Sequence, residues 1–291
     1  MRCAPSITWE VMERAFHLRY RRRMGSARPI GDHLREWRQR RRMSQLALAC
    51  GAEISTRHLS FLETGRSMPS REMVLHLADQ LEVPLRERNV LLTAAGYAPV
   101  FPERRLEDPA LAAARNAVTL VLKGHEPYPA LAVDRHWTML ACNDAVPPLL
   151  AGVDPLLLQA PVNVLRLSLH PAGLAPRIQN LAEWRAHLLA RLRRQIDLTA
   201  DAGLVELMRE LSGYPAPAAR LVHSRRNEER YAGVLVPLQL VAESGVLAFF
   251  STTTVFGTPV DVTLAELVME SFFPADVATA DALRRISAPA R

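Results

Sequence analysis

A short polar run in the N-terminal third of the chain carries side chains that can contact nucleic acid. Ser55, Thr56, Arg57, His58 and Ser60 are hydrogen-bonding residues that stand among apolar residues at helical spacing. Arg often bonds a guanine edge with two donors, and hydroxyl groups bond bases or phosphates. The run therefore predicts the exposed N-terminal end of a helix that enters the major groove. For His58 alone, an ordinary solvated helix surface is the alternative.

Two tightly joined helices would hold this run in place. Serines at the expected N-cap positions open both helices. Ala49 is small enough for the point where the helices cross, and Leu59 and Leu62 fall on the side that faces a helix bundle. Gln45, at the start of the first helix, can place its amide on a phosphate with help from the helix dipole. The predicted DNA-binding residues are Ser44, Gln45, Ser55, Thr56, Arg57, His58, Ser60 and Arg66.

The spacing of apolar residues predicts three further helices around this pair. One begins at Ile30 and buries Trp37, another begins at Ser70, and the last begins at Pro84 and ends near Gly96. Five short helices within residues 31–95 predict a compact all-α domain. A helical bundle used for dimerisation, or as a linker, is the alternative to DNA binding.

Positive charge is concentrated in the same part of the chain. Residues 1–100 hold 17 arginines and 10 acidic residues, a net charge of +7, whereas residues 101–291 hold 19 basic and 20 acidic residues. A basic module on a near-neutral body predicts a polyanion partner for the module and another partner for the body. A solvated basic surface remains the alternative, especially for Arg40, Arg41 and Arg42.

Residues 31–95 resemble the lambda-repressor-like, XRE-type helix-turn-helix family. The run from Gln45 to Glu63 carries the resemblance without a gap. The resemblance implies that Gln45 and the polar run face DNA, and that Arg38 of the first helix forms a salt bridge with Glu63 of the third. One position departs from the family, which usually has Gly where this chain has Glu53, a place where positive φ is common. We expect either an altered turn or strain of about 1 kcal/mol or more at this residue.

Proline-rich residues 99–108 predict a linker between a DNA-binding domain at residues 30–98 and a second domain at residues 109–291. Residues 1–29 are either a basic N-terminal arm or lie partly upstream of a true start at Met24. The sequence does not decide between these two interpretations.

Cysteine usage and hydropathy indicate the cellular setting. Cys3, Cys50 and Cys142 are far apart and form no CxxC pair, so we expect neither a disulfide framework nor a zinc site. No apolar run reaches the roughly 18 residues that a membrane span needs, and the N-terminus lacks the apolar segment of a signal peptide. We therefore expect a cytoplasmic protein with no metal, no cofactor and no membrane partner.

The second domain mixes helices and strands. The expected order is helix at residues 110–123, a hairpin at 130–133 and 138–141, mainly helix at 147–211, and strands at 234–241 and 246–256. Residues 264–272 fit either a helix or a last strand. This order predicts an α+β, PAS-like domain, with an antiparallel sheet and helices on one side of it.

The chain as a whole resembles the MmyB-like bacterial regulators, in which an XRE module precedes a PAS-like ligand-binding domain. The residues that carry this resemblance are 128–134, 137–143, 163–166, Trp184 and 267–274. The resemblance implies a pocket for an apolar molecule between the sheet and the helices, with fatty acid as the suggested ligand class.

The residues at 246–256 alternate between two partly apolar faces, so we expect both faces to be covered. Hydroxyls in this strand could bond a ligand head group, although the β-propensity of Thr explains them as well. The predicted ligand-binding residues are Arg166, Trp137, Phe249, Phe250, Thr252 and Thr254. Arg166 would meet a carboxylate head group, with Arg177 and Arg185 behind it, because a buried unpaired anion is costly.

Catalysis finds no support in the sequence. GxSxG, HExxH, P-loop and GxGxxG motifs are missing, and the histidines stand singly. We predict no catalytic residue and interpret the chain as a transcriptional regulator. It would bind a palindromic operator as a homodimer and sense a small apolar ligand. The alternative is a DNA-binding protein whose second domain is an enzyme, or a protein-interaction or dimerisation module.

Overall fold

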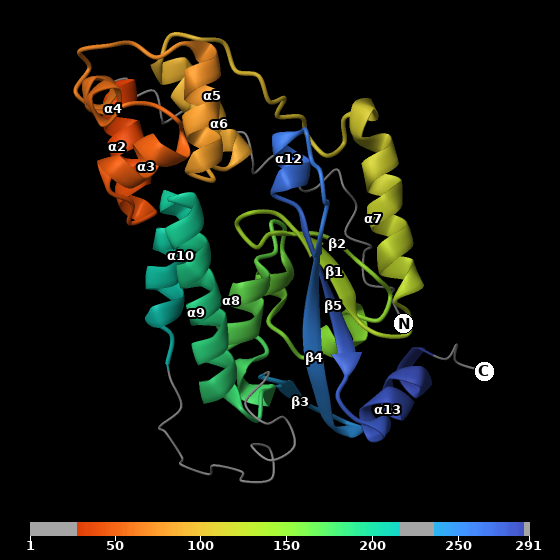
Figure 1. The fold of residues 1–291 in the computed structure, drawn as a ribbon. Helices are drawn as coiled ribbons and strands as arrows, with labels where there is room; N and C mark the ends of the chain where they lie inside the picture. Colours follow the sequence, from red (N-terminus) through yellow and green to blue (C-terminus); the bar gives the residue numbers. More distant parts are fainter. Residues whose placement is uncertain (1–27, 216–235, 288–291) are drawn as a thin grey trace.

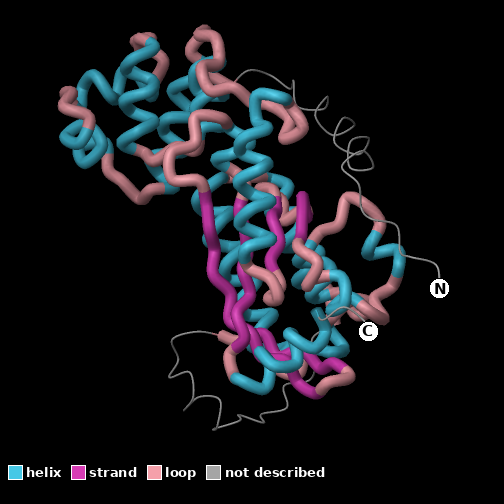
Figure 2. Tube along the Cα trace, turned by 90° about the vertical axis from the view of Figure 1, so that its right-hand side faces the viewer, coloured by secondary structure: helices cyan, strands magenta, loops and turns pink. Residues whose placement is uncertain are grey.

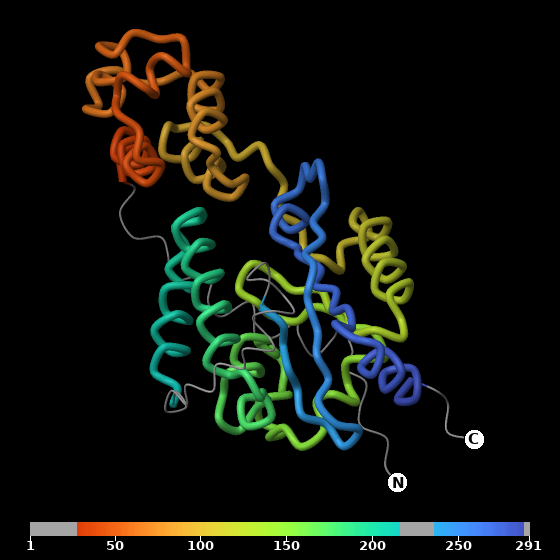
Figure 3. Tube along the Cα trace, turned by 60° about the horizontal axis from the view of Figure 1, so that its bottom comes forward, coloured from red at the N-terminus to blue at the C-terminus, as the bar shows by residue number. Residues whose placement is uncertain are grey.

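The computed structural model describes residues 28–215 and 236–287. Most of the predicted arm at residues 1–29 lies outside the described residues. The first residues of the strand predicted at 234–241 also lie outside them. Five short helices form the N-terminal unit, drawn in red to orange in Figures 1 and 3. They are α2 (Ile30–Arg40), α3 (Gln45–Gly51), α4 (Thr56–Glu63), α5 (Arg71–Gln80) and α6 (Leu85–Ala94).

Capping and burial explain why these helices form where the sequence predicts them. The side chains of Ser44, Ser55 and Ser70 each accept a hydrogen bond from a backbone N–H in the first turn of α3, α4 and α5. Leu59 and Leu62 of α4 are fully buried in the core shared by the five helices. The all-α domain expected from spacing is therefore present.

The turn between α3 and α4 shows the expected strain. Glu53 has φ = 53°, the left-handed conformation that favours glycine. Gly51 is instead the last residue of α3, and a Cβ atom there would lie 3.0 Å from the Gln80 Oε1 atom. The glycine two residues before Glu53 is therefore helical, and Glu53 supplies the left-handed residue of the turn.

The C-terminal unit is built on a five-stranded antiparallel sheet in the order β2-β1-β5-β4-β3. Its strands are β1 (Ala130–Val133), β2 (Met139–Cys142), β3 (Leu238–Ala242), β4 (Gly245–Val255) and β5 (Val268–Pro274). Its α-helices are α7 (Ala112–Gly124), α8 (Val164–Leu169), α9 (Leu181–Thr199), α10 (Ala202–Ser212), α12 (Val262–Ala265) and α13 (Val277–Ser287). Four short 3-10 helices complete the described part, at Pro109–Leu111, Pro147–Leu150, Pro155–Leu158 and Ala175–Arg177.

Helices cover both faces of this sheet, so the expectation of helices on one side was wrong (Figures 1 and 2). Val118 and Leu122 of α7 pack with Ala130 and Ala132 of β1 on one face. The opposite face packs against α8, α9 and α10, with Phe249 of β4 in that core. Apolar residues on both sides of β1 and β4 favour this two-sided arrangement.

Residues 264–272, which fit either a helix or a last strand by sequence, contain the end of a helix and the start of a strand. The short helix α12 ends at Ala265, and β5 begins at Val268. The C-terminal helix α13, which the sequence did not lead us to expect, packs against β4 and β5. Within the described ranges, no helix is long and apolar enough to cross a membrane.

Candidate DNA-binding surface and ligand-binding domain

The N-terminal end of α4 presents polar side chains to solvent. Thr56 and Arg57 are exposed, and His58 and Ser60 are half-buried. In helix-turn-helix proteins this end of the second helix lies in the major groove. The surface can therefore donate hydrogen bonds from a guanidinium, hydroxyls and an imidazole.

The two capping serines have a structural task on this surface. The Oγ atom of Ser44 accepts a hydrogen bond from the Ala47 N–H at 3.0 Å, and that of Ser55 accepts one from the His58 N–H at 3.1 Å. Each hydroxyl oxygen is thus an acceptor in its cap, while its O–H can still donate to a phosphate.

Phe61 lies between the two arginines predicted to contact DNA. The guanidinium of Arg57 lies 5.3 Å from the centre of the Phe61 ring, and that of Arg66 lies 5.8 Å from it. Such contacts are attractive and limit the rotamers that the arginines adopt. Sequence reasoning missed Phe61, although its position four residues after Arg57 on a helix is a signal.

A buried carboxylate ties the helices behind this surface. The Arg38 Nε and Nη2 atoms donate to the Glu63 carboxylate at 2.6 and 2.9 Å, so the expected pair is present. Gln45 Nε2 donates to the same carboxylate at 2.8 Å. Burial alone would raise the pKa of Glu63, but Arg38 and Gln45 hold it below its usual value.

The Gln45 amide also makes a contact inside the domain that the sequence did not lead us to expect. The amide was expected on a DNA phosphate, but one of its donors is used inside the domain, on Glu63. The buried Glu63 carboxylate has hydrogen-bond acceptor sites that Arg38 does not fill, and the Gln45 amide fills one of them.

The three arginines predicted for a ligand head group all bind protein oxygens. Arg166 forms a two-donor pair with Glu210, with both distances 2.7 Å. Arg177 and Arg185 donate to backbone carbonyls of neighbouring segments. Glu210 already neutralises the Arg166 guanidinium. The prediction that Arg166 pairs with a ligand carboxylate is therefore corrected.

The predicted ligand-binding residues of β4 do not share one face. Phe249 lies in the core with α8, α9 and α10, whereas Phe250 stacks on Phe273 at 5.3 Å on the opposite face. Thr252 and Thr254 alternate with Phe249 and are exposed. These four residues cannot line a single pocket, so the predicted set was wrong as a set.

Trp137 lies on the face of the sheet that α8, α9 and α10 cover. There it contacts an ion pair that sequence reasoning missed. Its ring is buried in that core, with the Arg191 guanidinium 4.7 Å from the ring centre. Arg191 pairs with Glu270 of β5, including one contact of 3.0 Å, and donates to the Thr253 hydroxyl at 2.9 Å. A glutamate inside an apolar strand was the available signal.

The space between the sheet and α8, α9 and α10, where we expected a pocket, is occupied by apolar side chains that contact one another. A hollow of about 410 Å³ lies instead at the boundary of the two units, lined in part by Arg86, Arg135, Asp201 and Glu266. Among the residues with described positions, no group of three or more His, Cys, Asp or Glu side chains could hold a metal ion.

Comparisons with known proteins agree with both units. Residues 29–91 match the model of a helix-turn-helix domain, and residues 114–286 match the model of the MmyB-like transcription regulator ligand-binding domain. No curated protein matches the chain. The helix-turn-helix domain and the ligand-binding domain together are those of a DNA-binding transcription regulator. The second match covers more than half of the chain, which therefore belongs to the family of MmyB-like transcription regulators.

Proposed function

We propose that the protein binds operator DNA through α3 and α4, and that Arg57 is the main base-contacting residue. The observation that carries this proposal is the exposed Arg57 side chain at the N-terminal end of α4. Thr56, His58, Ser60 and Arg66 contribute nearby base or phosphate contacts, and Ser44, Gln45 and Ser55 contribute phosphate contacts. A homodimer on a palindromic site, within the cytoplasm, completes this proposal.

Selection of binding sites from a random pool of duplex DNA tests it. The wild-type chain should enrich a site with two half-sites about one helical turn apart. Arg57→Ala should cost about 1–3 kcal/mol on that site and relax the preference for one base pair. An equal loss on specific and random DNA would show that Arg57 contacts only phosphate.

Arg40→Ala is the matched control, because it removes the same charge from α2. Arg40 already pairs with Glu36 on the surface of that helix, at 2.8 Å. This variant should leave the selected sequence unchanged and weaken binding to specific and random DNA alike. Loss of sequence preference in Arg40→Ala would assign base recognition to another surface.

We further propose that the C-terminal domain binds a molecule with an apolar chain, such as a fatty acid, between the sheet and helices α8, α9 and α10. Trp137 and Phe249 contribute apolar surface there, and the Arg191 guanidinium lies 4.7 Å from the centre of the Trp137 ring. Because the apolar side chains contact one another, a ligand has to displace some of them to enter.

Native mass spectrometry of the purified chain tests this second proposal. It should detect a bound lipid, or uptake of added palmitate, with a rise in melting temperature as the palmitate concentration rises. Leu188→Trp, which fills the same core, should weaken uptake, whereas Leu120→Trp on the exposed face of α7 should not. No bound mass and no melting shift with straight-chain fatty acids of any length would contradict the proposal.

A further inference from the structure

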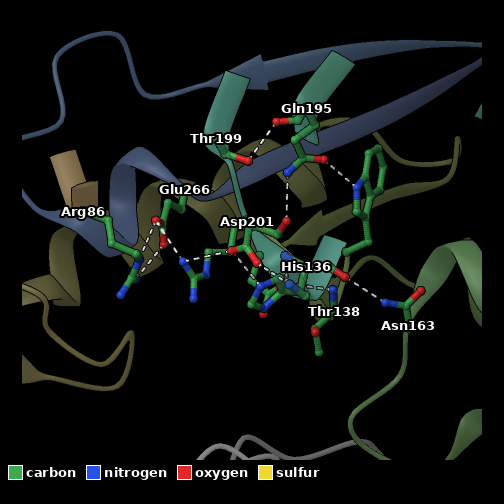
Figure 4. Close-up of polar contacts among 12 residues, drawn as sticks. Arg86, His136, Thr138, Asn163, Gln195, Thr199, Asp201 and Glu266 are labelled. Carbon is green, nitrogen blue, oxygen red and sulfur yellow. Dashed lines mark hydrogen bonds and ion pairs between the residues drawn. The ribbon is translucent and has the colours of Figure 1, made fainter. Parts of the chain in front are cut away.

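The two domains are joined by a two-donor ion pair. Arg86 of α6, in the DNA-binding domain, donates to Glu266 at 2.7 and 2.8 Å (Figure 4). Both side chains are largely buried at this boundary. Glu266 follows α12, which packs against α6. Burial alone would lower the pKa of Arg86, but Glu266 and Glu103 raise it above its usual value.

Glu266 also connects to the turn between β1 and β2. Arg135 in this turn lies 3.8 Å from Glu266 and 3.2 Å from Asp201. His136, the next residue, is 3.0 Å from the same Asp201 oxygen. Asp201 caps α10 through the Gly203 N–H, at 2.7 Å. The turn therefore touches both the domain boundary and the end of the α9–α10 helix pair.

The other end of this turn is held in the core of the ligand-binding domain. Trp137 has φ = 65°, a conformation that a bulky residue adopts only when its surroundings impose it. Its Nε1 donates to Gln195 Oε1 at 2.8 Å, and Gln195 Nε2 donates to the Arg135 carbonyl at 2.8 Å. The amide of Gln195 on α9, labelled in Figure 4, thus bonds both the buried ring of Trp137 and the backbone of Arg135.

We propose that Trp137 is a positioning residue for the DNA-binding domain. It acts through Gln195, Arg135 and Glu266 on Arg86 of α6. Movement of the Trp137 ring frees the strained turn, shifts Arg135 relative to Glu266, and so changes how Glu266 places Arg86 and α6. The proposal deepens the function proposed above, because a ligand that enters the core has to meet this ring.

Distances between the two domains test the proposal without DNA or ligand. Spin labels on cysteines introduced at the exposed Leu46 and Leu156, with the native cysteines replaced by serine, report domain placement in the full chain. Trp137→Phe removes the bond to Gln195 and should broaden and shift the distance distribution. Glu266→Gln, at the boundary, should do the same while the ligand-binding core stays intact.

Trp184→Phe is the matched control. Trp184 lies in the same core and donates through Nε1 to the Ser168 hydroxyl at 2.9 Å, so its loss is similar in kind. It should keep the wild-type distribution. An equal change in Trp184→Phe, or no change in either Trp137→Phe or Glu266→Gln, would overturn the proposal. The distance measurement uses neither DNA nor fatty acid. Its result can therefore be interpreted even if the proposed DNA or fatty-acid binding is wrong.

Discussion

Each domain contains a buried glutamate held by an arginine, and the surroundings of the two pairs differ. Glu63 in the helix-turn-helix domain has no exposed side-chain surface, and Arg38 and the Gln45 amide donate to it. Glu270 in the ligand-binding domain is 5% exposed, and its partner Arg191 is 23% exposed. Arg191 also bonds a hydroxyl and lies against an indole ring.

This difference separates a rigid domain from one that can rearrange. A charged donor from α2 and a neutral amide from α3 both bond Glu63 of α4, so these three helices are held in one arrangement. Arg191 lies beside a core that an incoming ligand would have to disturb. We infer that the Arg38–Glu63 pair preserves the DNA-binding surface. The Arg191–Glu270 pair lies where the ligand-binding domain changes conformation.

The largest expected effect is the loss of Arg38. Arg38→Ala leaves a fully buried carboxylate with the Gln45 amide and the more distant Arg35 guanidinium, at 3.6 Å, and breaking such a pair costs about 3–5 kcal/mol. The free energy of unfolding from urea titration, with hydrogen exchange in α2 to α4, measures this loss. Glu36→Ala removes surface pairs with Arg28 and Arg40 and should cost about 1 kcal/mol or less. Equal costs would remove the distinction between the buried and surface pairs.

The second effect concerns Arg191. Arg191→Ala should destabilise the chain by less than Arg38→Ala, about 2–3 kcal/mol, since Thr253 still donates to Glu270 at 3.2 Å and water can reach the site. Hydrogen exchange in β5 and α9 would locate the loss. A cost as large as that of Arg38→Ala would contradict the inference that the ligand-binding domain rearranges more easily than the helix-turn-helix domain.

Acid should weaken the helix-turn-helix domain through Glu63. The pKa of Glu63 is lower in the folded chain than in the unfolded chain, so the pair contributes stability above the ordinary glutamate pKa of about 4.3. That contribution is lost as pH falls through the folded value. Unfolding titrations from pH 6 downward should show the loss in wild type and a weaker pH dependence in Glu63→Gln. The same pH dependence in both would assign it to other carboxylates.

The smallest effect is expected at the turn before α4. Glu53→Gly relieves a left-handed φ and should raise the free energy of unfolding by about 1 kcal/mol or less, since glycine also makes the unfolded chain more flexible. Gly51→Ala is the contrasting variant. It should be neutral or raise the free energy of unfolding by about 1 kcal/mol, because alanine favours the helix and the exposed Gln80 side chain can move away from the new Cβ atom. A clearly destabilising Gly51→Ala would show that Gln80 is held in place.

Local signals made the helix-turn-helix domain predictable. Serine caps, helical spacing and the positions of Leu59 and Leu62 all lie within a few residues of what they determine. The Arg38–Glu63 pair followed from the resemblance. The amide of Gln45 did not, because its partner depends on how α3 packs against α4.

The ligand-binding domain was harder to predict because its contacts join distant segments. Arg166 looked unpaired until the fold brought Glu210 to it, 44 residues later. The strand at Phe249 and Phe250 was predicted, but which face met which helix was not. The connection from Trp137 to Arg86 spans both domains and has no signal in the sequence.

The dependence of operator affinity on bound ligand is the measurement that tests the central claim most directly. Binding of the full chain to its selected operator, with and without saturating palmitate, should differ by about fivefold or more, the usual size of coupling between two sites. Glu266→Gln should reduce this difference while still binding palmitate. Palmitate bound to the wild-type chain with no change in operator affinity would contradict the account.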